Sequence, residues 1–251
     1  MEKLALSLIE RFGYELHHKG IATLVIDPFE VTKELISSVN PMIFDIRANV
    51  GSTVKQYRTL FPNASIHCFE PFPQSFEALE VSMESDPSAS LHRIALSDTK
   101  GKATFHANAS PETNSLLLTD QSSSLYWEAA SLQTANIIEV ETTTVDAFCR
   151  ENNVPFVDMM KLDVQGAEFS VLTGAKEMLS TQSVSLIYTE LILVPTYEGQ
   201  KKLHEYIGLL DSFGYDLLDT YNPFRKHQQL IQTDCIFLSD KFKQSSKKAS
   251  S

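Results

Sequence analysis

Carboxylates close the first two apolar runs of the chain. The run that begins at Met42 ends at Asp45 and is followed by a turn that reaches Gly51, and the next run ends at Glu70. An apolar run, a glycine-containing turn and a helix-like stretch indicate a strand and a loop that approach a ligand. In dinucleotide-type α/β folds, the carboxylate at the tip of the following strand hydrogen-bonds two ribose hydroxyls. The two features together predict a site for a nucleoside-containing cofactor.

Two further carboxylates, Asp163 and Glu190, stand at or near the ends of later apolar runs. Ligands bind at the carboxyl edge of open α/β sheets, so either side chain is placed to take a proton from an acceptor or to orient it. Each also has a purely structural interpretation. Asp163 has the position of a helix N-cap or loop anchor, and Glu190 that of a solvated or paired carboxylate at a strand end. The sequence leaves both alternatives open.

The elements that must position these carboxylates alternate as they do around a parallel sheet. The predicted strands are residues 42–45, 65–69, 91–96, 158–163 and 184–191, with further strands at 103–106 and 137–143. The predicted helices are residues 52–60, 74–82, 144–150, 168–179 and 200–213. Strands at 215–219 and 233–238 are predicted to close the sheet as a hairpin, and Asn222-Pro223-Phe224 between them is interpreted as a turn.

The chain is predicted to contain one main domain, residues 41–240, because 251 residues suffice for a single sizeable α/β unit. Residues 1–40 are predicted to form a helical lead-in that packs on this domain. Residues 107–136 break the alternation with clusters of Ser, Thr and Asn. They are predicted to be an insertion, either a functional lid or a mobile segment. Residues 241–251, rich in Lys and Ser, are predicted to be a disordered tail.

Charge and composition argue against several kinds of partner. The chain has 21 Lys and Arg against 32 Asp and Glu, and its formal net charge of −11 opposes binding to nucleic acid or to anionic lipid. No apolar run reaches the roughly 18 residues that a membrane helix needs. The three cysteines are isolated and the histidines form no spaced set, so neither a disulfide nor a metal site is predicted. We expect a cytoplasmic protein; the sequence does not indicate its oligomeric state.

The motifs of the chain follow one another in a recognisable order. They are Phe44-Asp45-x-x-Ala48-Asn49-x-Gly51, Phe69-Glu70-Pro71, Ala95-Leu96-Ser97-Asp98, Lys161-Leu162-Asp163-Val164-x-Gly166-Ala167-Glu168 and Thr189-Glu190. Over roughly residues 40–240 the chain resembles the FkbM family of S-adenosylmethionine-dependent methyltransferases. The resemblance implies a class I methyltransferase fold, a Rossmann-like three-layer α/β sandwich with a mostly parallel seven-stranded sheet and a terminal antiparallel strand. It also implies O-methylation of a small-molecule, sugar or peptide hydroxyl or carboxyl.

The resemblance also implies roles for individual residues toward S-adenosylmethionine. Glu70 would hold the ribose hydroxyls, Pro71 and Phe72 would lie near the adenine, and Ala95 would line its edge. The residues implied around the methionine part are Asp45, Ala48, Asn49 and Gly51, and Arg47 lies within the same predicted loop.

The chain departs from the family pattern at two positions. Arg47 stands where the family's loop has Gly, and Gln165 replaces a Glu. Arg47 either crowds the cofactor, because Gly serves where backbone approaches a ligand closely, or pairs with the methionine carboxylate. Gln165 removes a charge but keeps a hydrogen-bonding side chain of similar size.

Two other functions compete with methyl transfer. In the first, Arg47 prevents cofactor binding and the chain is a binding domain that keeps the methyltransferase fold. The second, a nicotinamide-dependent oxidoreductase, is disfavoured because no Gly-x-Gly-x-x-Gly follows the first strand.

Overall fold

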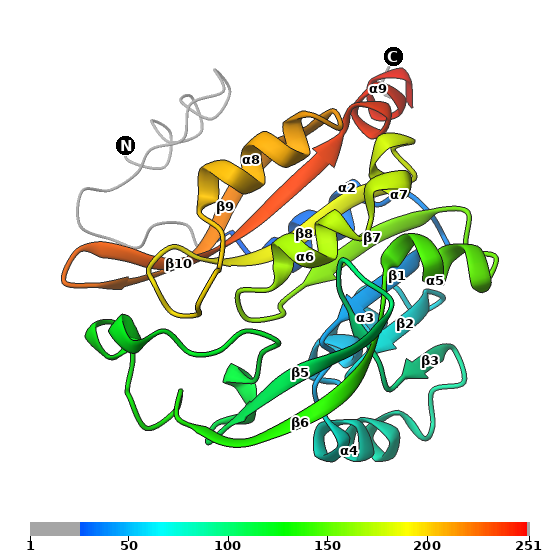
Figure 1. The fold of residues 1–251 in the computed structure, drawn as a ribbon. Helices are drawn as coiled ribbons and strands as arrows, with labels where there is room; N and C mark the ends of the chain where they lie inside the picture. The colour runs from blue at the N-terminus through cyan, green and yellow to red at the C-terminus, as the bar shows by residue number, and fades with distance from the viewer. Residues whose placement is uncertain (1–25, 250–251) are drawn as a thin grey trace, which may run out of the picture.

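Seven strands form one central sheet in the order β3-β2-β1-β7-β8-β10-β9 (Figure 1). The structure is a computed structural model that describes residues 26–249. The strands are β1 (Met42–Ile46), β2 (Ser65–Phe69), β3 (Ala89–His92), β7 (Val157–Leu162), β8 (Val184–Ile192), β9 (Tyr215–Lys226) and β10 (Gln229–Ser239). The first five in spatial order run parallel, and β10 is antiparallel to both of its neighbours. This confirms the expected mostly parallel sheet with an antiparallel terminal strand.

Helices cover both faces of this sheet and complete three layers (Figure 1). One hydrophobic core joins a face of the sheet to α5 (Val145–Glu151), α6 (Glu168–Thr173), α7 (Lys176–Ser180) and α8 (Leu203–Asp211). The second core joins the other face to α2 (Pro28–Leu35), α3 (Ser52–Leu60) and α4 (Pro73–Met83). Side chains alternate along β1, so that Phe44 and Ile46 enter the first core and Ile43 the second.

A second, three-stranded sheet in the order β4-β6-β5 was not expected from the sequence. Its strands are β4 (Ala95–Leu96), β5 (Gly101–Asn108) and β6 (Thr134–Thr143). The connection between β5 and β6 makes up most of the expected insertion at residues 107–136. It contains the 3₁₀ helices η1 (Pro111–Thr113) and η2 (Gln121–Leu125).

Two predicted elements are each divided in the structure. The strand predicted at 91–96 is two strands, because the chain leaves the large sheet after His92 and joins the small sheet at Ala95. The helix predicted at 168–179 is broken into α6 and α7 around Gly174. The Gly174 backbone approaches the end of β4 so closely that a Cβ there would lie 2.0 Å from the carbonyl oxygen of Ser97.

The structure also changes the account of the C-terminal part. The turn expected at Asn222-Pro223-Phe224 is wrong, because these residues lie within β9. This strand is at the edge of the sheet, where a proline is tolerated since its missing donor faces no partner. Helix α9 (Asp240–Ala249) occupies most of the stretch expected to be a disordered tail. Of the expected lead-in, the described part contains α2, and residues 1–25 lie outside the described residues.

None of the described helices is both long enough and apolar enough to cross a bilayer.

Candidate active site

The carboxylates of Asp45, Asp163 and Glu190 lie at neighbouring strand ends. β1 and β8 flank β7. Asp45 on β1 is paired in register with Lys161 on β7, and Glu190 lies on β8, the next strand. The edge of these strands opens into a cavity of about 350 Å³. Its lining comes from the β1–α3 loop, the β5–β6 insertion, the ends of β7, β8 and β10, and the loop after β8. Five separate parts of the sequence are thus brought to one place, at the edge where ligands bind in an open α/β sheet.

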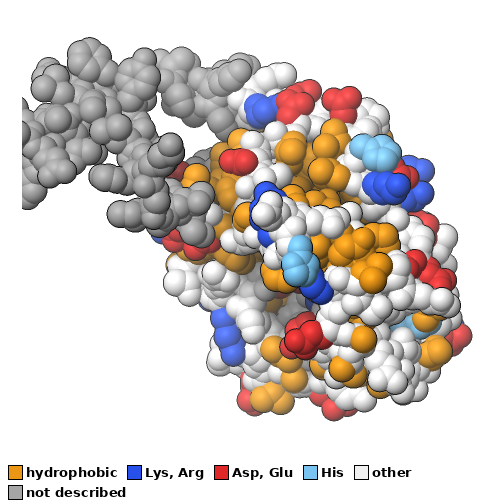
Figure 2. All heavy atoms as spheres, turned by 90° about the vertical axis from the view of Figure 1, so that its left-hand side faces the viewer, with side chains coloured by type: hydrophobic (Ala, Val, Ile, Leu, Met, Phe, Trp, Pro, Cys, Tyr) orange, Lys and Arg blue, Asp and Glu red, His pale blue; other side chains and the backbone are white. Residues whose placement is uncertain are grey.

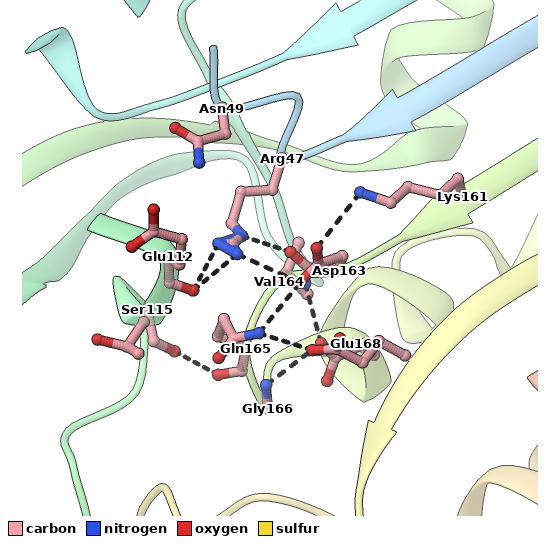
Figure 3. Close-up of polar contacts among 12 residues, drawn as sticks. Arg47, Asn49, Glu112, Ser115, Lys161, Asp163, Val164, Gln165, Gly166 and Glu168 are labelled. Carbon is pink, nitrogen blue, oxygen red and sulfur yellow. Dashed lines mark hydrogen bonds and ion pairs between the residues drawn. The ribbon is translucent and has the colours of Figure 1, made fainter. Parts of the chain in front are cut away.

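Asp163 lies between two cations (Figure 3). The Arg47 guanidinium is 3.3 Å from its Oδ1 and the Lys161 ammonium is 3.4 Å from its Oδ2. Burial alone would raise the pKa of Asp163, but Arg47 and Lys161 outweigh it and hold this pKa below its usual value. The side chain therefore stays ionised and is a weak proton acceptor. Its carboxylate is bonded to the side chains of Arg47, Lys161 and Gln165 and does not cap a helix, so the remaining structural alternative for Asp163 is a loop anchor.

Asp45 is fully buried, and neither carboxylate oxygen accepts a hydrogen bond of good geometry. The Lys161 ammonium, 3.3 Å from Oδ1, is its ion-pair partner. Burial raises the pKa of Asp45, while Lys161 opposes the rise. Such an incompletely paired carboxylate is costly to bury, which marks the position as one that a ligand with a positive group would satisfy. Lys161 belongs to one of the sequence motifs, but the sequence did not indicate that it pairs with Asp45.

Gln165 joins the two catalytic candidates. Its Nε2 donates to Asp163 Oδ1 at 3.1 Å and to Glu190 Oε1 at 2.8 Å, and its Oε1 accepts from the Tyr197 hydroxyl at 3.0 Å. The residue that replaces a family Glu thus provides a donor that a carboxylate lacks. Its φ of 55° and the φ of 90° at Gly166 make the tight turn that aims this side chain.

Glu190 combines burial with acidic neighbours. Besides Gln165, it accepts a hydrogen bond from Gln232 Nε2 at 2.5 Å. Burial raises the pKa of Glu190 well above its usual value, and the nearby carboxylates of Asp163 and Asp234 raise it further. Glu190 is thus not a solvated strand-end carboxylate, and it is the stronger proton acceptor of the two candidates. Gln232 lies on β10, where the sequence gave no signal of a site.

Glu168 stabilises the turn that carries Gln165. Its Oε1 accepts hydrogen bonds from the backbone N–H groups of Val164 at 2.9 Å and Gly166 at 3.2 Å (Figure 3). Burial raises the pKa of Glu168 to about 7. It holds the loop that carries Gln165 and does not line the cavity.

The expected cofactor loop and Glu70 are in direct contact. Glu70 is only 3% exposed, and its two oxygens accept from the backbone N–H groups of Asn49 and Phe72, each at 2.9 Å. Gly51 takes the left-handed backbone conformation, with φ of 85°, at the start of α3. Ala48 and Asn49 line the cavity. The carboxylate at the β2 tip thus faces the turn after β1, in the arrangement that the sequence predicted.

The residues expected around the adenine separate into two groups. Pro71 and Ala95 line a small cleft of about 20 Å³ together with Phe105 and Leu116. Phe72 lines neither this cleft nor the large cavity, and its ring stacks on that of Phe105 with centroids 5.9 Å apart.

Arg47 reaches across the site. Its Nε donates to the carbonyl oxygen of Asp163 at 2.5 Å, and its two terminal nitrogens donate to the carbonyl oxygen of Glu112 at 3.0 and 2.8 Å. Figure 3 shows the guanidinium between these two residues. Its φ of 73° is one that Gly adopts without cost.

Two aromatic side chains line the large cavity. They are Trp127 and Tyr197. Trp127 donates from Nε1 to Thr196 Oγ1 at 2.7 Å and stacks on Phe224 of β9, with centroids 5.5 Å apart. Tyr126 packs in the small cluster beside them.

Within the described residues, no group of three His, Cys, Asp or Glu side chains is placed to hold a metal ion.

Comparisons with known proteins place this site in a family. The sequence model of the Methyltransferase FkbM domain matches residues 45–217. The 2-O-methyltransferase NoeI of Sinorhizobium fredii is 33% identical over 183 residues, which cover 71% of this chain and 74% of that protein. The hexuronic acid methyltransferase AglP of Haloferax volcanii is 23% identical over 151 residues, covering 60% of this chain and 55% of that protein.

A solved structure agrees in fold. The methyltransferase FkbM of Methylobacillus flagellatus superimposes with a TM-score of 0.52 and 12% identity, covering 81% of this chain and 44% of that one. The domain match spans the β1 loop, Glu70, Asp163 and Glu190, so the motifs and the matched region coincide. The chain belongs to the FkbM family of methyltransferases.

Proposed function

We propose that the protein transfers a methyl group from S-adenosylmethionine to an oxygen of a sugar or another small molecule. The observation that carries this proposal is the meeting of Asp163 and Glu190 at one cavity that the β1 loop also lines, with Glu70 hydrogen-bonded to that loop. Class I methyltransferases need little catalytic machinery, because the cofactor supplies the reactive group and the protein aligns the acceptor.

The residues present fit the cofactor. Glu70 lies at the β2 tip, where a ribose is bound in such folds, and each of its oxygens has a second lone pair to offer. The carboxylate oxygens of Asp45, which accept no hydrogen bond of good geometry, suit an ammonium or another positive group. The apolar side chains around Pro71 and Ala95 are of the kind that packs against a purine edge, although the cleft between them is narrow in this structure. When bound, the cofactor would supply an electrophilic methyl group on a sulfonium.

Glu190 is the proposed general base. The acceptor hydroxyl would lose its proton to the Glu190 carboxylate as its oxygen forms the new bond to the methyl carbon and the bond from that carbon to sulfur breaks. The loss of the positive charge on sulfur would be balanced by the loss of the negative charge on Glu190. Its raised pKa makes it a stronger base than an ordinary carboxylate. Asp163 stays ionised between Arg47 and Lys161 and would orient the acceptor.

The proposed acceptor class follows from the cavity and the relatives. Trp127 and a set of polar side chains line the cavity, which suits a ring that stacks on an aromatic face and carries hydroxyls. The names of NoeI and AglP specify a 2-O-methyl product and a hexuronic acid substrate for those proteins. A peptide hydroxyl or carboxyl is the less favoured acceptor.

The acidic net charge supports a partner other than nucleic acid, and on the face drawn in Figure 2 the Lys and Arg side chains lie in separate small groups. We propose a cytoplasmic location with no membrane partner.

The test is turnover with a panel of hexuronic acids, deoxyhexoses and their oligosaccharides, measured as S-adenosylhomocysteine released. Glu190→Gln is expected to lower kcat by about 10²- to 10⁴-fold, since it removes the proton acceptor but keeps the shape. The matched control is Glu198→Gln, which removes an exposed carboxylate from the loop after β8. Equal loss in both variants, or none in Glu190→Gln, would remove Glu190 from the mechanism.

The second candidate is a binding domain without cofactor, and the position of Arg47 favours it. Calorimetry with S-adenosylmethionine and S-adenosylhomocysteine separates the two functions. A dissociation constant at micromolar or below, about −8 kcal/mol, would support the enzyme.

A further inference from the structure

Arg47 connects two segments that belong to different sheets. Arg47 directly follows β1 of the large sheet. Its guanidinium is hydrogen-bonded to Glu112 in the insertion between β5 and β6 of the small sheet. We propose that Arg47 is a positioning residue that latches residues 111–116, here called the strap, across the cofactor cleft, so that the strap must be released before the cofactor enters. This inference rests on the proposed function, because it presumes a cofactor at the β1 loop.

The strap is held at several points along its length. The Ser115 hydroxyl donates to the carbonyl oxygen of Gln165 at 2.7 Å. The Tyr197 hydroxyl lies 2.9 Å from the carbonyl oxygen of Thr113 and 3.0 Å from Gln165 Oε1, and it shares its single proton between the two. Ser115 and His106 exchange both backbone hydrogen bonds, at 2.8 and 3.2 Å. Arg47 adds three bonds from a charged donor, two to the strap and one to Asp163, and such bonds are stronger than neutral ones. The strap is therefore fixed from the loops after β1, β7 and β8 together.

The latched strap divides the cleft. Arg47 lines both the 350 Å³ cavity and the 20 Å³ cleft, and Asn114, Ser115 and Leu116 of the strap form a wall of the smaller one. A space of about 20 Å³ holds roughly one water molecule. The smaller cleft, which lies beside Pro71 and Ala95, is thus too small for a purine while the strap is in this position.

The latch also stores backbone strain. A φ of 73° is strained for a non-glycine residue, and it persists only where surrounding contacts impose it. The Arg47 side chain is 9% exposed and its contacts with Glu112 and Asp163 supply that constraint. When these contacts break, the guanidinium becomes free to pair with an anionic group of the ligand, such as the methionine carboxylate. The Arg47 guanidinium would then bind either the strap, in the closed cleft, or the cofactor, in the open one.

The test compares Arg47→Gly and Arg47→Lys with the unchanged chain, using calorimetry with S-adenosylhomocysteine and hydrogen exchange of the peptides that contain His106 and Ser115. Arg47→Gly is expected to bind at least tenfold more tightly and to exchange these strap amides at least tenfold faster. Arg47→Lys keeps the charge but cannot fork to Glu112, so it is expected to speed exchange as well. Arg150→Ala, which removes an exposed arginine from α5, is the matched control and should change neither quantity.

Each outcome decides a separate question. Weaker binding by Arg47→Gly with unchanged strap exchange would overturn the latch and make Arg47 a cofactor ligand. Faster exchange together with no binding by any variant would keep Arg47 as the latch of the strap and overturn the proposed methyl transfer. Unchanged exchange in both Arg47 variants would overturn the inference, whatever the affinities are.

Discussion

Gln165 and Glu168 hold one short turn by opposite means. Gln165 is a neutral amide that donates to two carboxylates, whereas Glu168 is a buried carboxyl that accepts from two backbone N–H groups. A buried carboxyl has a cost when it ionises, because low polarity disfavours the charged form. At this position the hydrogen bonds are useful to the fold and the charge is not.

Glu168→Gln is therefore expected to stabilise the protein in a pH-dependent way. The pKa of Glu168 in the folded protein is about 7, above its ordinary value of 4.5, so the folded state keeps a proton that the unfolded chain releases. Folding stability falls as the pH rises through this window, by about 3 kcal/mol in total. The Gln variant, which can still accept both bonds, should match the unchanged chain at pH 5 and exceed it by up to about 3 kcal/mol at pH 8.

Urea unfolding at the two pH values measures this difference. Glu80→Gln, at an exposed position of α4, is the control and should show no pH-dependent gain. A Glu168→Gln effect that is equal at pH 5 and pH 8 would show that the charge carries no cost.

Much of the candidate site was predictable residue by residue. Asp163, Glu190 and the β1 loop were found because each follows an apolar run at the same sheet edge. Lys161 was missed because it lies inside such a run, where a buried lysine has no sequence signal until its partners are known. Glu112 and Gln232 come from an insertion and an antiparallel strand, and only tertiary contacts bring them to the cavity. The bridging role of Gln165 likewise depends on its turn geometry.

The elements show the same division between local and tertiary causes. α3 and β2 have the predicted bounds, because a strong local pattern and clear turn residues fix both ends. The sequence did not show that β4, β5 and β6 form a separate sheet, because alternation marks a strand without naming its partner. Nor did it show the break between α6 and α7, which a contact with a distant strand causes.

Two glycines in helical surroundings test that cause. Gly174→Ala would place a Cβ 2.0 Å from the Ser97 carbonyl oxygen, which is backbone and cannot rotate away. We expect a loss of at least about 1–3 kcal/mol in unfolding free energy, as for overpacked cores. Gly208→Ala in α8 is the matched control, because a Cβ there meets nothing within 4 Å. It should gain about 0.5–1 kcal/mol from the better helix propensity of Ala.

Denaturant unfolding of both variants decides the point. Similar effects in the two variants would mean that the Gly174 contact is not what divides the two helices.

For the whole molecule, the site is the seam between two sheets. The large sheet supplies the strand ends, and the small sheet supplies the insertion that closes over them. The Trp127–Phe224 stack and the bonds from Lys226 to the carbonyl oxygens of Leu125 and Tyr126 extend this seam to the β9–β10 hairpin. A ligand in the cavity would contact the strand ends of the large sheet and the β5–β6 insertion, so its binding would be coupled to the position of that insertion.

The seam also concentrates acid. Asp45, Glu70 and Glu190 each have a pKa raised above the ordinary value, chiefly by burial, so they retain protons at a higher pH than exposed carboxylates do. A sulfonium cation favours their ionised forms, and its binding should release protons. Affinity for S-adenosylmethionine is therefore expected to rise with pH. S-adenosylhomocysteine lacks that positive charge and should show less than half of this dependence.

Calorimetry in two buffers of different ionisation enthalpy counts the released protons directly, and Glu190→Gln should lower the count. Equal pH dependence for the two ligands would mean that the buried carboxylates do not sense the sulfonium, and that the charge of the site serves the acceptor instead.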